Sequence, residues 1–217
     1  MKNRKYILFD LDGTLSDPGE GIINSLKYAL KQFGINGDPQ ILRKFIGPPL
    51  ADSFQEHYDF DEEKTAEAIR FYREYFHEYG LFQNVIYPGI PELLQDLTNS
   101  GKTLAIATTK PTVYAQQILE YFKIDHFFEK DLVVGSYLDG RRTNKAELIA
   151  TVLECLGGNP QEMVMIGDRK FDIIGAKANG IDVIGVTYGY GEKEEIKSHE
   201  PTAIAATVGK LREILLG

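Results

Sequence analysis

The sequence predicts an α/β fold in which a Rossmann-like parallel sheet forms the core and carries an inserted all-helical cap domain. Short apolar runs of strand length recur along the chain, and each ends at a small or acidic residue. These runs span residues 6–9, 103–107, 163–166 and 182–186, with a weaker one at 132–134. Because they lack polar alternation, they indicate strands covered on both faces by helices, as in a parallel sheet. The segments between the later runs have helical patterns, which completes the α/β alternation.

The inserted domain is predicted from a long stretch between the first two runs, residues 16–83, which has helical periodicity and no convincing strand. The α/β core then consists of residues 1–15 and 84–217, and the helical cap of residues 16–83. The chain leaves the sheet just after the first strand and returns before the next, so both crossings should lie at the carboxyl end of the strands. Ligands bind at that edge of open α/β sheets, and the cap is therefore expected over the site.

Two long helices are expected in the insertion. The first should begin at Asp17 and Pro18, because aspartate caps helices and proline suits the first helical position. Apolar residues then recur at helical spacing over residues 22–33, and Gly34 follows as a stop signal. The second helix should span about residues 61–79, with its aromatic side chains packed against a neighbouring helix.

The composition is that of a globular protein, and it argues against a polyanionic partner. Of the 217 residues, 43% are hydrophobic and 26% are charged, and the formal net charge is −8. A nucleic-acid polymer or an anionic membrane is bound through clustered lysine and arginine, so neither is expected as a partner. No pattern marks an oligomer interface, and the oligomeric state stays open.

The only cysteine, Cys155, excludes an intramolecular disulfide and suits a reducing compartment. It lies in an apolar helical run and is expected to be a small buried residue. The apolar stretch near the N-terminus, residues 6–9, is too short for a signal peptide or a membrane span. We therefore expect a cytoplasmic protein.

Two acids at the end of the first predicted strand are the leading catalytic candidates. Asp10 and Asp12 lie two residues apart, and Gly13 lets the chain turn after them. Side chains at positions i and i+2 of a strand face the same side, so both carboxylates can converge on one point. Such a pair can divide the work, with one acid ionised as nucleophile and the other holding a proton for the leaving group. Taken alone, the pattern indicates a catalytic pair and an ordinary structural turn equally well, because acidic strand ends followed by a glycine turn are common.

A second acidic pair, Asp168 and Asp172, follows the apolar run at residues 163–166. If a helix begins there, residues four apart can lie on one side of its first turn. Together with Asp10, the pair makes an oxygen-rich cluster without histidine or thiolate, which favours a hard cation such as Mg²⁺. Asp172 alone could equally stabilise a helix N-terminus.

Phosphoryl transfer requires positive charge at the site, because an anionic nucleophile must approach an anionic phosphate. In an acidic chain that charge must come from a metal, Lys110 or Lys145. Thr108 closes the second predicted strand and can donate its hydroxyl to a phosphate, with backbone amides from Thr109 onward helping at the start of the next helix. Lys145 opens a predicted helix and can reach the same oxygens.

These segments, in this order, resemble the four motifs of the haloacid dehalogenase-like phosphatases, and the resemblance covers the length of the chain. The first motif corresponds to Asp10-Leu11-Asp12-Gly13-Thr14, the second to Thr108 in Ile106-Ala107-Thr108-Thr109-Lys110-Pro111, the third to Lys145, and the fourth to Gly167-Asp168 through Asp172. The combination of all four is specific in a way that no single motif is.

The resemblance implies a Mg²⁺-dependent enzyme that hydrolyses a phosphomonoester through an aspartyl phosphate on Asp10, which also binds the metal. Asp12 would supply a backbone carbonyl to the metal, protonate the departing alcohol and then activate water. The remaining implied roles are phosphate binding by Thr108 and Lys145, metal binding by Asp168, and support of the metal shell by Asp172.

The insertion further resembles the four-helix cap of the phosphoglycolate phosphatase and β-phosphoglucomutase branch. Residues 46–50, 109–111 and 188–191 resemble bacterial proteins labelled phosphoglycolate phosphatase or 5′-nucleotidase-like. These labels make phosphoglycolate and nucleoside 5′-monophosphates the substrate candidates, although Thr109 stands where phosphoglycolate enzymes often have asparagine.

Three other functions are compatible with parts of this pattern. A haloacid dehalogenase needs neither an acid at Asp12 nor Mg²⁺, and is disfavoured. A sugar phosphomutase of the β-phosphoglucomutase type would use the same core motifs, which do not distinguish it from a phosphatase. A non-enzymatic regulatory or receiver-like protein also accepts phosphate among aspartates, but a receiver would be shorter and would lack Asp12. The cap selects the leaving group, so the physiological substrate stays open.

Overall fold

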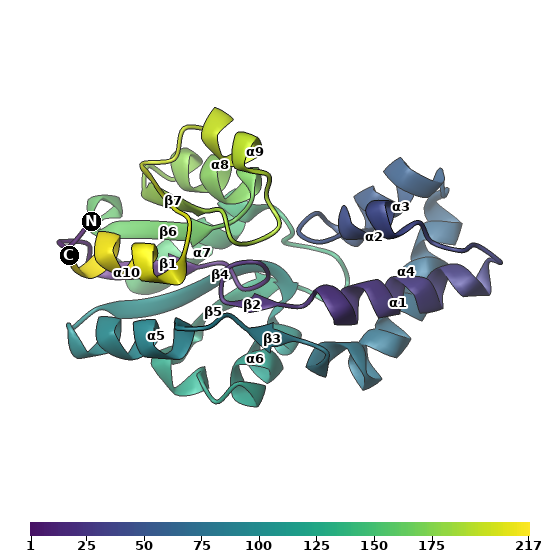
Figure 1. Cartoon of the computed structure of the whole chain (residues 1–217), viewed down its shortest axis with the longest axis horizontal. Coiled ribbons are helices and arrows are strands. Elements are labelled where there is room, and N and C mark those ends of the chain that lie inside the picture. The colour runs from purple at the N-terminus through teal and green to yellow at the C-terminus, as the bar shows by residue number, and fades with distance from the viewer. The chain divides into compact units, whose positions relative to one another are not determined.

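Six parallel strands form one sheet in the order β5-β4-β1-β6-β7-β8 (Figure 1). The structure, a computed structural model, describes residues 1–217. The strands are β1 (Tyr6–Phe9), β4 (Thr103–Pro111), β5 (Phe128–Ser136), β6 (Met163–Gly167), β7 (Asp182–Val186) and β8 (Ala203–Ala205). This sheet confirms the predicted parallel α/β fold. β8 was not predicted, because three residues are too few for a sequence pattern.

The central strand β1 places the candidate acids at one edge of the sheet. Its last residue, Phe9, pairs with Ile106 of β4 on one side and with Ile166 of β6 on the other. Since all three strands run in the same direction, the residues after Phe9 and Ile166 emerge together at the carboxyl end. The chain order reverses across β1, which is the position where open α/β sheets bind ligands.

Strand β4 is longer than the sequence indicated. The prediction ended it at Ala107, before Thr108, whereas the strand continues to Pro111 and the next helix begins only at Thr112. The cause is tertiary: Pro111 pairs with Ser136 of β5 after a register shift, and the Ser136 hydroxyl donates to the Thr109 carbonyl oxygen at 2.8 Å. The amides near Thr109 therefore belong to a strand and not to a helix N-terminus.

Helices cover both faces of the sheet, as the apolar strands require. On one face, α7 (Lys145–Leu156), α8 (Lys170–Ala178) and α9 (Lys193–Ser198) enclose a core that includes Leu8, Ala105 and Met165. The helices α5 (Ile90–Asn99), α6 (Thr112–Tyr121) and α10 (Val208–Leu216) complete the α/β unit, whose single-turn 3₁₀ helices are Asp125–Phe127 and Pro160–Glu162. None of the helices has the length and apolar character needed to cross a membrane.

The prediction for Cys155 was wrong, since its side chain is exposed. The buried stripe of α7 consists of Lys145, Leu148, Ile149 and Val152. In the last turn Leu153 and Leu156 still pack against the core, whereas Cys155 between them is exposed. An apolar sequence run does not reveal which of its residues face away from the core.

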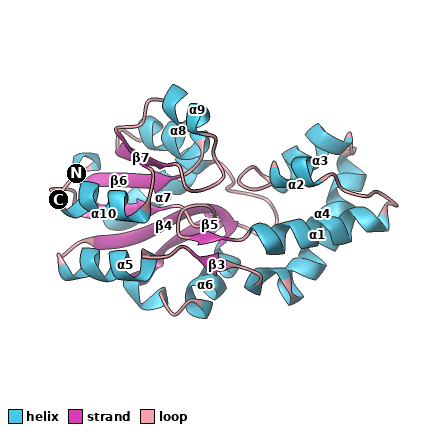
Figure 2. Cartoon of the chain, viewed as in Figure 1, coloured by secondary structure: helices cyan, strands magenta, loops and turns pink.

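The chain divides into two compact units, one of residues Met1–Ser16 and Ile86–Gly217 and the other of residues Asp17–Val85. The second unit is helical, as Figure 2 shows. Its helices are α1 (Gly19–Gln32), α2 (Pro39–Arg43), α3 (Leu50–Tyr58) and α4 (Glu62–Glu78), followed by a 3₁₀ turn at Gly80–Phe82. Within this unit, Tyr75 of α4 contacts Tyr28 of α1 with ring centroids 5.5 Å apart, and Tyr72 and Phe76 of α4 are buried. These aromatic residues pack as expected, whereas Tyr79, after the helix, is exposed.

Two features at the ends of the insertion differ from the prediction. The short strands β2 (Ser16–Asp17) and β3 (Val85–Ile86) form a two-stranded sheet where no strand was expected, since two residues carry no pattern. The helix α1 begins at Gly19 and not at Pro18; Asp17 accepts a hydrogen bond from the Gly19 amide at 2.9 Å.

Candidate active site

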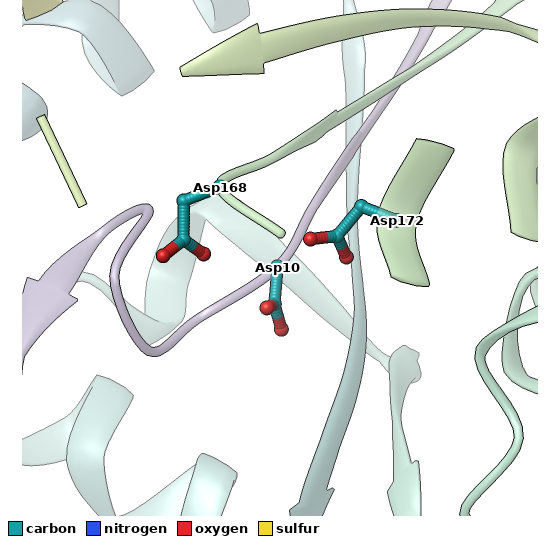
Figure 3. Close-up of side chains that lie close together, drawn as sticks. All are labelled: Asp10, Asp168 and Asp172. Atoms are coloured by element: carbon teal, nitrogen blue, oxygen red, sulfur yellow. The ribbon is translucent and has the colours of Figure 1, made fainter. Parts of the chain in front are cut away.

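Three buried carboxylates, those of Asp10, Asp168 and Asp172, converge at the carboxyl end of β1 and β6 (Figure 3). One oxygen of each lies within 4.8 Å of the others. The three residues come from separate segments: Asp10 follows β1, Asp168 follows β6, and Asp172 lies in the first turn of α8. The acidic cluster expected from the sequence is therefore present.

Local backbone geometry brings these acids together. Gly13 has φ of +81°, and a Cβ atom there would lie 2.2 Å from Oδ2 of Asp168, so only glycine allows the turn after β1 to approach that carboxylate. The sequence suggested that Asp168 lies on the first turn of a helix, but α8 begins only at Lys170. The Asp172 side chain caps the start of this helix, since its Oδ2 accepts a hydrogen bond from the Arg169 amide at 3.0 Å.

Lys145 links two of the three acids. Its Nζ atom lies 2.9 Å from Oδ1 of Asp10 and 2.8 Å from Oδ1 of Asp172, and it donates to the Ala107 carbonyl oxygen at 3.0 Å. The lysine is the first residue of α7, where the Asn144 side chain caps the helix by accepting from the Ala146 amide. The predicted position of Lys145 at a helix start is confirmed, and it places the ammonium group inside the acidic cluster.

The cluster holds more negative than positive charge, and its pKa values reflect this. Burial, followed by the charges of Asp172 and Asp10, raises the pKa of Asp168 to about 8. Burial also raises the pKa of Asp172 to about 6, although Lys145 opposes the shift. For Lys145, burial by itself would lower the pKa, but the Asp10 and Asp172 carboxylates outweigh it and raise the pKa above its ordinary value.

The donor set fits a hard cation. All candidate ligand atoms are carboxylate oxygens. Burial, and after it the repulsion between the carboxylates, raises the pKa of Asp168 and Asp172, and a divalent cation would offset both effects. Mg²⁺ needs only one or two carboxylates, with water and substrate oxygens filling its other positions. The cluster therefore has the chemistry of a magnesium site.

Asp12 is paired differently from Asp10. Its Oδ2 lies 2.7 Å from Nζ of Lys110, whereas its Oδ1 is buried and has no hydrogen-bond partner in the protein. Burial raises the pKa of Asp12, and Lys110 only partly opposes this. An acid with a raised pKa near a nucleophilic carboxylate suits proton transfer. In the sequence Lys110 stood only as a possible counter-charge for phosphate, and its pairing with Asp12 was not predicted.

The two predicted phosphate-binding threonines lie side by side on β4. Thr108 is buried, and its hydroxyl oxygen accepts a hydrogen bond from the Lys110 amide at 3.3 Å. Thr109 is half-buried. Both stay phosphate-binding predictions.

Residues 188–191, between β7 and α9, contribute contacts that the sequence did not predict. The Tyr190 amide donates to Oδ2 of Asp168 at 2.7 Å, and the Tyr188 hydroxyl donates to the Thr14 carbonyl oxygen at 3.1 Å. Close approach depends on Gly191, where a Cβ atom would lie 1.8 Å from the Asp168 carbonyl oxygen. The alternation of glycine and tyrosine is visible in the sequence, but nothing in it indicates that this segment contacts Asp168, about 20 positions earlier.

Gly191→Ala should destabilise the protein, because the added methyl group must push residues 188–191 away from Asp168. A loss of about 1–3 kcal/mol in the free energy of unfolding is expected from such overpacking. Thermal and denaturant unfolding measure it. The matched control is Gly209→Ala in α10, where the nearest atom to a new Cβ would be 3.8 Å away. Equal stability of the two variants would contradict a close fit around Asp168.

Comparisons with known proteins agree with this geometry. A family model described as haloacid dehalogenase-like hydrolase matches residues 7–186. A 5′-nucleotidase of Pseudomonas aeruginosa is 46% identical over 96% of this chain and 94% of its own length. A phosphoglycolate phosphatase of Vibrio vulnificus is 30% identical over 98% of this chain and 96% of its own.

Two further proteins match along nearly the whole chain. A crystal structure from Clostridium difficile, of a protein assigned as a phosphatase, is 51% identical with a TM-score of 0.90, and covers 100% of both chains. A Mycobacterium tuberculosis protein named tyrosine-protein kinase PtkA is 37% identical over 97% of this chain and 72% of its own. The family resemblance inferred from the four motifs is confirmed: the chain belongs to the haloacid dehalogenase-like hydrolase family.

Proposed function

We propose that this hydrolase acts on a small phosphomonoester, with Mg²⁺, through an aspartyl phosphate on Asp10. The hydrolysis of phosphate monoesters rests on the relatives and solved structures named as phosphatases. The observation that supports the mechanism most directly is that the two acids have different partners: Asp10 lies against Lys145, and Asp12 lies against Lys110. Phosphoglycolate and nucleoside 5′-monophosphates are the substrate candidates, after the names of the relatives.

Asp10 and Asp168 would hold the metal, together with the backbone carbonyl of Asp12, and Asp172 would complete or support the shell. When bound, Mg²⁺ supplies charge neutralisation for the phosphate. This assignment is supported by the buried, oxygen-only cluster and by the raised pKa values of Asp168 and Asp172.

In the first half-reaction a carboxylate oxygen of Asp10 attacks phosphorus. The new bond joins Asp10 to phosphorus, and the bond from phosphorus to the ester oxygen breaks. Asp12 gives its proton to the leaving oxygen, which departs as the alcohol. Lys145 orients the Asp10 carboxylate. The side chains of Thr108 and Lys145 and the backbone amide of Thr109 hold the phosphoryl oxygens.

In the second half-reaction Asp12, now ionised, accepts a proton from water as the water oxygen attacks phosphorus. The bond between phosphorus and Asp10 breaks, so that inorganic phosphate leaves and both acids return to their starting states. The buried Oδ1 of Asp12 suits this double role, because no protein group competes for its proton. Residues 16–83 are proposed to act as a cap domain to the core of residues 1–15 and 84–217.

Mg²⁺-dependent release of p-nitrophenol from p-nitrophenyl phosphate tests the reaction class. We expect turnover with Mg²⁺ and none after chelation by EDTA, with recovery when Mg²⁺ is restored. A screen of phosphorylated metabolites, including phosphoglycolate and nucleoside 5′-monophosphates, then identifies the substrate. Failure to hydrolyse any monoester in the presence of Mg²⁺ would reject the proposal.

Asp12→Asn should slow both half-reactions, since the amide neither donates nor accepts the proton. A fall of about 10²–10⁴-fold in kcat is expected, which is the usual contribution of general acid–base catalysis. Rapid-quench measurements of phosphoenzyme formation and decay follow the two steps separately, and calorimetry should find Mg²⁺ still bound. A slowing of only one step would mean that another group moves the second proton.

Two other transfers of the phosphoryl group have specific support. A sugar phosphomutase uses the same core motifs, and isomerisation of a sugar phosphate without phosphate release would favour it. The relative named as a tyrosine kinase suggests transfer from ATP to a protein. Incubation with γ-labelled ATP and a tyrosine-containing polypeptide separates this activity from hydrolysis: label on the polypeptide would support the kinase and label in free phosphate the phosphatase.

A further inference from the structure

Lys110 is a buried ammonium group that the mechanism above does not employ. Its side chain is only 5% exposed, and its Nζ atom lies 2.7 Å from Oδ2 of Asp12. The other buried lysine of the site, Lys145, contacts Asp10 and Asp172. The two lysines therefore serve different acids: one faces the nucleophile and the metal cluster, and the other faces the proposed proton donor.

The fold holds the backbone of Lys110 closely in place. The residue lies near the end of β4, where its amide donates to the Thr108 hydroxyl at 3.3 Å. Strand β5 approaches it so tightly that a Cβ atom on Gly135 would lie 2.3 Å from the Lys110 carbonyl oxygen. The adjacent Pro111 pairs with Ser136. Because its backbone is held in place and its side chain is buried, Lys110 has its ammonium group in a defined position.

We propose that Lys110 is a positioning residue for Asp12. A charge-assisted hydrogen bond to Oδ2 holds the carboxyl group in one orientation and leaves the buried Oδ1 for proton transfer to the leaving oxygen and from water. This inference rests on the proposed function, because it assigns Lys110 a part in the acid–base step of that mechanism.

The proposal differs in a measurable way from a role as a phosphate-binding cation. Loss of a phosphate-binding cation would weaken all substrates alike, since they share the phosphoryl group. Loss of Asp12 positioning would instead slow phosphoenzyme formation in proportion to the basicity of the leaving oxygen, and would slow phosphoenzyme hydrolysis alike for all substrates. A p-nitrophenolate leaves without protonation, whereas an alkoxide depends on it.

The test compares Lys110→Met with wild type on p-nitrophenyl phosphate and on an alkyl monophosphate that the wild type hydrolyses. Hydrolysis of the phosphoenzyme is common to both esters, so rapid-quench measurements should follow its formation. We expect the rate of formation to fall by less than about 10-fold with the aryl ester and by about 10²–10³-fold with the alkyl ester. The affinity for substrate and the calorimetric affinity for Mg²⁺ should change by less than about 2-fold, because Asp10, Asp168 and Asp172 keep their contacts. Lys110→Arg should recover part of the loss on the alkyl ester, since it keeps the charge and the donors.

Lys130→Met is the matched control, as this lysine is exposed on the neighbouring strand β5; it should match wild type. Equal losses in the rate of phosphoenzyme formation with both esters, together with weaker substrate binding, would overturn the inference in favour of phosphate binding. If Lys110→Met does not fold, Lys110→Gln gives the same comparison.

A double variant separates this inference from the proposed function. In the Asp12→Asn background, Lys110→Met should cause no further loss on the alkyl ester, because there is no proton donor left to position. Additive losses would overturn the positioning role while leaving the proposed function intact. If Asp12→Asn itself shows no dependence on the leaving group, the acid–base assignment fails, and the positioning role fails with it.

Discussion

Asp10→Asn should abolish turnover, with a loss of at least about 10³-fold in kcat. An amide has no anionic oxygen to attack phosphorus. The aspartyl phosphate therefore cannot form, and no later step can follow. The substitution is nearly isosteric, and the buried side chain keeps an oxygen that can accept a hydrogen bond from Lys145, which lies 2.9 Å from the carboxylate in the native protein. The loss should therefore appear in chemistry without unfolding.

Two measurements check this prediction. Steady-state hydrolysis of p-nitrophenyl phosphate gives the loss in kcat, and acid quench with labelled substrate shows whether a phosphoenzyme accumulates. The control is Asp131→Asn, an exposed acid on β5, which should behave as wild type. Unchanged activity in Asp10→Asn would reject the covalent mechanism, whereas lost activity with a persistent phosphoenzyme would place the nucleophile on another residue.

Asp168→Asn should stabilise the metal-free protein while removing its response to Mg²⁺. Burial and the neighbouring carboxylates of Asp172 and Asp10 raise the pKa of Asp168 from 3.8 to about 8. Between these values the folded state binds more protons than the unfolded state, so the free energy of unfolding falls as the pH rises from about 4 to about 8. Asparagine carries no charge to bury, so it avoids this loss.

Thermal unfolding in EDTA at pH 5 and pH 8 measures the effect. The advantage of the variant over wild type should be larger at pH 8 than at pH 5, by on the order of 1–3 kcal/mol. Asp172, with a pKa raised to about 6, adds a loss of the same sign over about pH 4 to 6 in both proteins. A variant less stable than wild type at pH 8 in EDTA would contradict an excess of buried negative charge.

With Mg²⁺ the order should reverse. In wild type we expect the cation to replace the bound proton. Mg²⁺ should therefore raise Tm, and its affinity should increase from pH 6 to pH 8 with release of protons. Calorimetric titrations in two buffers of different ionisation enthalpy count those protons. Asp168→Asn should lose most of the stabilisation by Mg²⁺, and its retention would assign the metal to other ligands.

Much of the fold follows from local patterns. The apolar runs marked five of the six strands of the main sheet, since a strand buried on both faces must be apolar along its length. Helical spacing marked α4 from about residue 61, and in the structure the Asp61 side chain caps its first turn by accepting from the Lys64 amide at 2.9 Å. The strand β8 and the end of β4 were missed, because they depend on pairing with segments distant in the sequence.

The sequence by itself determined that Asp10 and Asp12 follow one strand, that Asp168 follows another, and that Lys145 begins a helix. It did not determine the place of Thr108, which lies within β4 and not at its end. Strand ends and helix caps are local features, set by neighbouring residues. Only the tertiary structure decided the partners, with Lys145 against Asp10 and Lys110 against Asp12. Those contacts join residues about 100 positions apart or more, and their distances depend on the register of a sheet that no local pattern encodes.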